Sequence, residues 1–263
     1  MPLATRSIDK GRLADQIFND LKDQIISGAL QRGQKLPTEK ELSELYSVSG
    51  PTVREAIRGL SVIGLIEVRQ GSGAYVSANG EALVAMSLSA VMQLETVGVA
   101  DALNIQKVLC VHAATCAVEK GTDADIRRLK ETCAALGAAQ NGEQAAAGVR
   151  AFHYALAKAS HNALLEVICS FLTNIQVEFA RIMTEGKIGA WQKMFSELHE
   201  LRLRLVQAIE RRDAKAAAKA AEEFHQHAIF QVTSLPKARQ VSLKDPRLGS
   251  VVSSILSELE PHT

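Results

Sequence analysis

The chain has 263 residues, with 30 lysines and arginines and 29 aspartates and glutamates, which gives a net charge of +1. This balance excludes a uniformly basic nucleic-acid-binding protein, so any basic surface has to be local. The length suffices for two domains with separate cores, and a hydrophobic content of 47 % is ordinary for a globular protein. No apolar run approaches the length of a membrane span, so we expect no membrane partner.

The four cysteines lie in helical, apolar stretches and include no C-x-x-C pair. This pattern predicts buried, reduced thiols in a cytoplasmic protein, with neither a zinc nor a disulfide role. The residues concerned are Cys110, Cys116, Cys133 and Cys169.

A polar N-terminal stretch, 1–11, is predicted to be a flexible tail. Apolar residues from Ala14 to Ile25 then recur at helical spacing, and Gly28 ends the pattern. We expect this amphipathic helix to pack beneath the next two helices as the third member of a small bundle.

Residues 36–64 predict two short helices joined by a tight turn. Thr38 is a suitable cap for the first helix, because Glu41 lies three residues later and completes a capping box. Ser49 is a suitable cap for the second helix, and Pro51 fits its first turn. The helical spacing buries Val53, Ile57 and Leu60 and leaves Thr52, Arg54, Glu55 and Arg58 outside.

Two extended segments, 65–69 and 74–76, flank a glycine-rich turn and predict a β-hairpin. Two helices followed by a hairpin form a winged helix-turn-helix. Its second helix is narrow enough for the major groove of DNA, and the hairpin tip can lie beside it. Residues 12–79 are therefore predicted to be a DNA-binding domain of three helices and a small β-hairpin.

Beyond Gly80 the sequence has almost no strand signal. Its short connections make neighbouring helices antiparallel, so we expect a helical bundle and a mostly α fold overall. A linker helix over 80–99 is predicted to precede an all-helical effector-binding and dimerisation domain over 100–235, and a tail, 236–263, follows. The predicted helices are 81–95, 100–120, 123–139, 143–160, 163–183, 190–212 and 214–235.

The run LPTEKELSELYSVSGPTVREAIRGLSVIGLIEVRQGSGAYV resembles the DNA-binding domain of the GntR family of bacterial transcription regulators. The helical remainder, about 100–234, resembles the ligand-binding domain of the FadR subfamily. The resemblance implies a regulator that binds DNA as a homodimer. We favour a repressor over an activator, although the sequence does not choose between the two. A single winged domain makes few contacts, which also predicts a homodimer on a pseudo-palindromic operator in double-stranded DNA.

Arg54 is the candidate for reading guanine, since its fork can pair with O6 and N7 together. By resemblance, Arg54 and Lys40 match basic positions of the family, whereas Gly50 stands where the family usually has an arginine. The hairpin tip matches positions that reach into the minor groove. The predicted DNA-contacting residues are Lys40, Ser49, Gly50, Thr52, Arg54, Arg58, Gln70 and Gly71.

Many FadR-subfamily domains hold a divalent metal through an Asp-x3-His pair and two later histidines, and the metal binds a carboxylate effector. The equivalent positions here are Val149, His153, Arg202 and Phe224, so three of the four ligands are absent. We therefore expect no required cofactor. Arg202 would replace the metal as the cation that pairs with an apolar or aromatic organic acid. Gln106, where the family tends to have an arginine, completes the predicted effector site.

A second interpretation keeps a divalent metal at a displaced site. His199 lies three residues before Arg202, and His227 lies three residues after Phe224. In antiparallel helices both shifts go the same way, so His199 and His227 would still face His153. The other histidines, His112, His161, His225 and His262, are interpreted as structural or surface side chains.

Two further classes of protein remain open. One is a helical lyase or hydrolase fused to a DNA-binding module, although the sequence has no HExxH, GxSxG or phosphate loop and we expect no enzyme. The other is a nucleoid or scaffold protein without a ligand.

Overall fold

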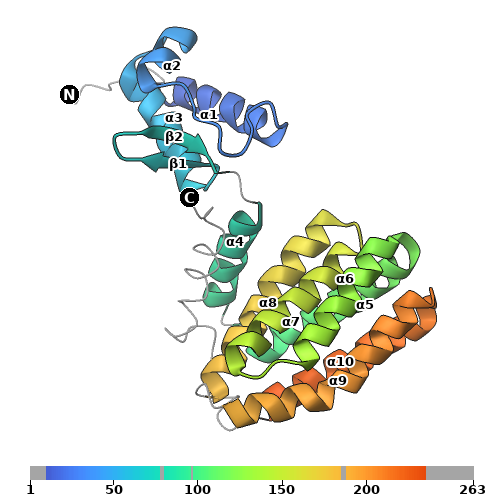
Figure 1. Ribbon diagram of the computed structural model, residues 1–263. Helices are drawn as coiled ribbons and strands as arrows, with labels where there is room; N and C mark the ends of the chain where they lie inside the picture. The colour runs from blue at the N-terminus through green and yellow to red at the C-terminus, as the bar shows by residue number, and fades with distance from the viewer. Residues whose placement is uncertain (1–9, 78–79, 96, 185–187, 235–263) are drawn as a thin grey trace. The chain divides into compact units, whose positions relative to one another are not determined.

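The computed structural model describes residues 10–77, 80–95, 97–184 and 188–234 (Figure 1). The chain divides into two compact units, Met1–Leu83 and Val84–Thr263, which we call the winged unit and the helical unit. Residues 1–9 of the predicted N-terminal tail and the predicted C-terminal tail lie outside the described residues, whereas Lys10 and Gly11, which were predicted to be part of the tail, begin the first helix.

The winged unit contains the predicted three helices and antiparallel hairpin, in which Ile66 pairs with Val76. Its core gathers Leu21 of the first helix, Leu42 of the second and Val53 of the third. The prediction of a winged helix-turn-helix is therefore confirmed. The elements are α1 (Lys10–Ile26), α2 (Glu39–Tyr46), α3 (Gly50–Val62), β1 (Ile66–Arg69) and β2 (Gly73–Val76).

Local capping fixes where the two motif helices begin. Thr38 caps α2, because its hydroxyl accepts from the Glu41 amide while the Glu41 carboxylate accepts from the Thr38 amide at 2.7 Å. Ser47 ends α2 in the left-handed conformation with φ of 53°, so the chain turns sharply before α3. Pro51 lies in the first turn of α3 as predicted.

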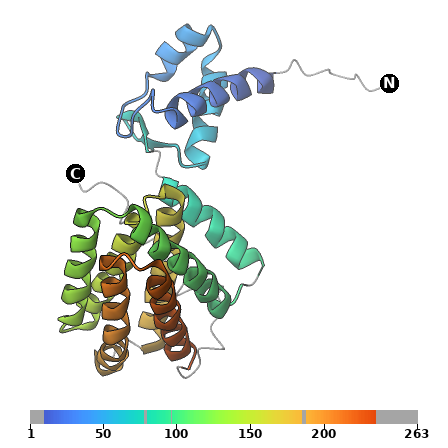
Figure 2. The same ribbon diagram turned by 90° about the vertical axis from the view of Figure 1, so that its right-hand side faces the viewer.

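The described part of the helical unit is built from helices, as predicted (Figures 1 and 2). The views show α5 to α10 lying side by side, and α10 packs against both α5 and α9 while α7 packs against α6 and α8. Thr122, Asn141 and Asp213 cap three of these helices with their side chains. Helix α4 (Gly80–Leu94) begins in the winged unit and continues into the helical unit. The other helices are α5 (Val99–Lys120), α6 (Asp123–Gly137), α7 (Gly142–Lys158), α8 (Ala163–Thr184), α9 (Ile188–Glu210) and α10 (Ala214–Thr233).

Helix α8 corrects one expectation. Its 22 residues are long and apolar enough to cross a membrane by length and composition. However, 56 % of its apolar window is buried inside the structure, and residues such as Cys169, Phe171 and Val177 belong to the core. A helix that its neighbours cover on most sides is apolar because it lies in the core. The burial of α8 is therefore that of a core helix.

Candidate functional site

Helix α3 presents two arginines to solvent. Arg54 and Arg58 are both exposed, and the Arg54 Nε donates a hydrogen bond to a Glu39 carboxylate oxygen at 3.0 Å. The Arg54 side chain remains 66 % exposed, and an ion pair this open contributes little free energy. The guanidinium can therefore exchange Glu39 for another acceptor at small cost.

Thr52 is not on the outer face of α3 as predicted. It is only 7 % exposed, and its hydroxyl shares a hydrogen bond of 2.8 Å with the Ser49 hydroxyl. Thr52 and Ala56 are four residues apart and bury one side of the helix together with Val53. Ser49 does precede α3 as its N-cap, yet its hydroxyl bonds Thr52 instead of a backbone amide.

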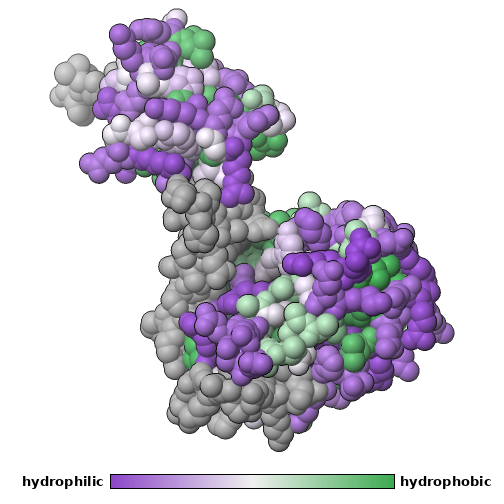
Figure 3. All heavy atoms as spheres, viewed as in Figure 1, coloured by the Kyte–Doolittle hydropathy of each residue, from purple (hydrophilic) through white to green (hydrophobic). Residues whose placement is uncertain are grey.

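The remaining predicted DNA-contacting residues are accessible. Lys40 is exposed and lies 4.0 Å from Glu44, and Gln70 and Gly71 are exposed in the hairpin turn, where Gly71 has φ of 73°. A Cβ added at Gly50 would meet no atom closer than 3.9 Å, so packing does not require a glycine there. Figure 3 shows mainly hydrophilic residues on the viewed face of the winged unit.

The helical unit contains an apolar cavity among α6 to α10, with a volume of about 30 Å³. Four of the five predicted effector residues contribute to its wall. The lining consists of Leu136, Val149, His153, Gln176, Val177, Ala180, Leu198, Arg202, Phe224, Ala228 and Val232.

Gln106, the fifth predicted effector residue, does not line this cavity. Its side chain is 1 % exposed, and its amide nitrogen donates to the Thr173 hydroxyl at 3.0 Å. Gln106 therefore joins α5 to α8 in the core of the helical unit.

Arg202 gives the cavity wall its positive charge. The side chain is 1 % exposed, and its guanidinium carbon lies 6.0 Å from the centre of the Phe224 ring. Burial lowers the pKa of Arg202 to about 10, so the group remains charged at neutral pH. A cation in an apolar wall favours an anionic ligand that brings an apolar body.

The cavity does not fit the divalent metal that many FadR-subfamily domains hold. Of the four equivalent positions, only His153 carries a ligand atom, since Val149 and Phe224 are hydrocarbon and Arg202 is a cation. A buried guanidinium repels a metal ion placed beside it.

The structure also does not assemble the displaced set of His153, His199 and His227. His227 is exposed, and its Nδ1–H donates to the Glu223 carbonyl at 2.9 Å. His199 lies against Gly137, where its ring would meet an added Cβ at 2.6 Å. A shift of three residues turns the side chain about 60° away from the original helix face, which is enough to direct His227 outward.

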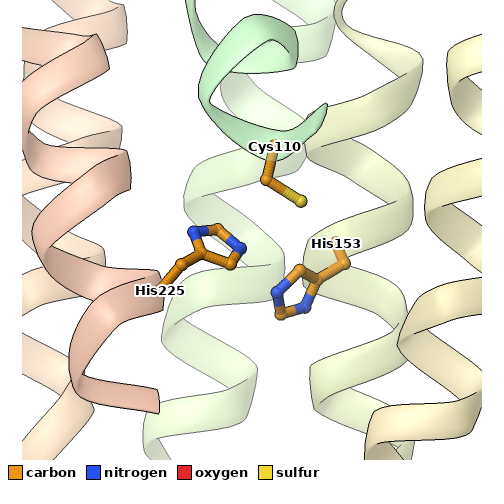
Figure 4. A group of neighbouring side chains, drawn as sticks. All are labelled: Cys110, His153 and His225. Carbon is orange, nitrogen blue, oxygen red and sulfur yellow. The ribbon is translucent and has the colours of Figure 1, made fainter. Parts of the chain in front are cut away.

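A different set converges at the centre of the helical unit. Cys110 of α5, His153 of α7 and His225 of α10 point toward one another (Figure 4), and their potential ligand atoms all lie within 4.8 Å of one another. Sequence reasoning assigned structural roles to Cys110 and His225. The sequence could have indicated this cluster only through the helix faces on which Cys110 and His225 lie, since both faces are turned toward His153.

Both imidazoles are held as the same neutral tautomer. The Nδ1–H groups of His153 and His225 donate to the carbonyls of Val149 and Ala221, at 2.9 and 2.8 Å. Burial lowers the pKa of His153 to about 4 and that of His225 to about 3, so both rings are neutral at pH 7. Their Nε2 atoms are buried and have no hydrogen-bond partner in the described structure.

Two family models match the chain. Residues 13–76 match the model described as bacterial regulatory proteins, gntR family, and residues 101–227 match the FCD domain. The HTH-type transcriptional regulator LutR of Bacillus subtilis is 33 % identical over 181 residues, which cover 67 % of this chain and 82 % of that protein. The Uxu operon regulator of Haemophilus influenzae is 32 % identical over 206 residues, covering 76 % of this chain and 74 % of that protein.

One further relative matches only a short segment of this chain, and one solved structure matches most of it at low identity. The regulator Mce2R of Mycobacterium tuberculosis is 38 % identical over 69 residues, and the match covers 29 % of that protein. Among solved structures, Streptococcus agalactiae GntR has a TM-score of 0.61 at 23 % identity, covering 82 % of this chain and 99 % of that chain. This structural likeness supports the fold alone.

Proposed function

Because the chain belongs to the GntR family of bacterial transcription regulators and carries an FCD ligand-binding domain, we propose that it is a cytoplasmic, homodimeric repressor controlled by an organic acid. The relatives are transcription regulators, which argues against the fused helical enzyme. The winged unit would bind one half of a pseudo-palindromic operator, and the helical unit would bind the acid in its apolar cavity.

The observation that carries the effector class is the buried charge of Arg202. Its guanidinium sits in a wall otherwise made mainly of aliphatic side chains and Phe224. A carboxylate can accept two parallel hydrogen bonds from a guanidinium, and such bonds are strong where water is excluded. The hydrocarbon lining favours an apolar or aromatic body on the acid.

The narrowness of the cavity supports coupling between ligand and DNA. Its volume is small, so an acid has to separate the helices that line it. A ligand that binds one packing of these helices more tightly shifts the population toward that packing. We propose that the favoured packing is the one that disfavours operator binding, which gives repression relieved by the acid.

A thermal-shift screen of organic acids tests the effector class. Each acid is paired with its uncharged amide, which keeps the shape and removes the carboxylate, and each pair is measured with and without a chelator. We expect some acids to raise the melting temperature and weaken operator binding while their amides do neither, regardless of chelator. Equal stabilisation by acid and amide would rule out Arg202 as the recognising group.

A variant tests the DNA-reading role of Arg54. Arg54→Ala should weaken specific operator binding by about 1–3 kcal/mol and relax specificity at one base pair in each half-site. Arg128→Ala is the matched control, since Arg128 is an exposed arginine that pairs with Glu131 on α6 of the helical unit. Titration of operator variants by fluorescence anisotropy measures both effects. If Arg54→Ala kept the base preferences of the parent chain, Arg54 would not read bases.

A further inference from the structure

The Cys–His cluster, consisting of Cys110, His153 and His225, lies in the core where three helices meet (Figure 4). Cys110 is 1 % exposed, and the two histidines are 3 % exposed each. In Figure 4 the thiol and one edge of each imidazole face the same small space. Only His153 is shared with the apolar cavity, since Cys110 and His225 are not part of its lining.

Hydrogen bonding leaves the two imidazoles at this space unsatisfied, whereas the Cys110 thiol shares a hydrogen bond with Cys169. The Nδ1–H groups of His153 and His225 are occupied by backbone carbonyls, so each Nε2 carries a lone pair. Neither Nε2 has a hydrogen-bond partner among the residues that the structure describes. A buried acceptor without a partner costs about 1–3 kcal/mol, and two such acceptors that face one space indicate an occupant.

We propose that the Cys–His cluster binds one thiophilic d10 metal ion, Zn²⁺ or Cu⁺, through the Cys110 sulfur and the Nε2 atoms of His153 and His225. A thiolate and two neutral imidazoles are ligands that both ions prefer. The carbonyl bonds at Nδ1 orient the rings, as outer partners do in protein metal sites. On binding, the thiol proton leaves to solvent and the sulfur bonds the metal.

The distances and charges fit such an ion. Tetrahedral bonds of about 2.0–2.3 Å place ligand atoms about 3.3–3.6 Å apart, so donor atoms within 4.8 Å of one another need to approach by at most about 1.5 Å. The thiolate neutralises Cu⁺ and leaves Zn²⁺ with a single positive charge and an open fourth position. A net charge of zero or +1 at the site keeps small both the cost of burying the ion and its repulsion by the nearby Arg202 cation.

Titration of the full, chelator-treated chain with Co²⁺ tests the proposal, since Co²⁺ reports a thiolate ligand through a sulfur-to-metal charge-transfer band. We expect one equivalent to produce the band and Zn²⁺ to displace it. A parallel anaerobic titration with Cu⁺ against a coloured Cu⁺ chelator identifies which ion binds more tightly. Absence of the band together with no Cu⁺ transfer would refute the metal site and leave a water molecule as the occupant.

Matched variants locate the ligands. Loss of a residue that only orients a metal ligand weakens metal binding by up to about 100-fold. Cys110→Ser and His225→Gln each remove a ligand itself, so each should weaken metal binding by more than that. The controls are Cys116→Ser and His227→Gln, which alter a second thiol on α5 and an exposed histidine two residues along α10. Circular dichroism verifies that each variant is folded, and Cys110→Ser keeps the side-chain volume.

Two outcomes decide the assignment. Loss of the band in Cys110→Ser and His225→Gln, with both controls unchanged, supports it. Retention of the band in folded His225→Gln, or its loss in Cys116→Ser, where the thiol lies 3.5 Å from the His112 ring nitrogen, would assign the metal elsewhere. The effector proposal stands apart from these results, because its test compares acids with amides.

Discussion

Replacing Arg202 by methionine should make the helical unit more stable while removing its response to organic acids. The pKa of Arg202 falls from its usual range to about 10, mainly because the group is buried. This fall corresponds to a cost of roughly 3 kcal/mol at neutral pH. Because the side chain is only 1 % exposed, solvent screening does not reduce this cost. An apolar side chain of similar length recovers up to about 3 kcal/mol, reduced by the free energy of the contacts that the guanidinium makes.

Urea unfolding and calorimetry of the full chain measure the change in stability, and the thermal-shift assay measures the response to acids. Arg150→Met is the matched control. Arg150 donates to Asn174 and to Glu178, each at 2.8 Å, so its loss strips partners from two groups and should lower the unfolding free energy. An acid that depended on Arg202 should lose about 3–6 kcal/mol of binding free energy in Arg202→Met, since two charge-assisted hydrogen bonds disappear.

A loss of stability in Arg202→Met comparable with that in Arg150→Met would refute this reasoning, because it would make Arg202 a structural residue. An undiminished response of Arg202→Met to the acids would refute the carboxylate assignment even if stability rose.

Three other predictions concern the caps, the histidines and the DNA-reading helix. Thr38→Ala should destabilise the winged unit by about 1 kcal/mol, measured by urea unfolding, because the first helix of the motif loses its capping box. In the chelator-treated chain, lowering the pH from 7 to 5 should cost the helical unit about 2 kcal/mol for each of His153 and His225. The unfolded chain binds protons near pH 6.5, whereas the buried rings bind them only near 4 and 3; calorimetry across this range checks the loss. Gly50→Arg should leave the melting temperature unchanged, since an added Cβ meets nothing closer than 3.9 Å. It should also strengthen DNA binding and increase its salt dependence, which anisotropy at several salt concentrations would detect.

The sequence predicted features that depend on neighbours along the chain. The capping box of Thr38 and Glu41 joins residues three apart, and the helical stripe of Val53, Ile57 and Leu60 needs only the period of one helix. The breaks between the helices of the second unit are similarly local. These elements were therefore predicted within a few residues of their observed ends.

Features that depend on how helices face one another were not predicted. Thr52 was assigned to the outer face of its helix because the stripe of Val53, Ile57 and Leu60 leaves it out, yet its hydroxyl is satisfied by Ser49 and the residue is buried. Cys110 and His225 come from helices far apart in the sequence, and no motif spacing relates them to His153. Only the packing of α5, α7 and α10 reveals that their side chains converge.

The two clusters of buried residues have no member in common among the described residues. One runs from Ile17 to Val76, and the other runs from Met92 to Val232. A core that is complete in itself leaves no void when its neighbour in the chain is exchanged. A chimera that keeps this chain up to Leu83 and continues with a foreign sensor should fold, and it would place the same operator under a new chemical signal.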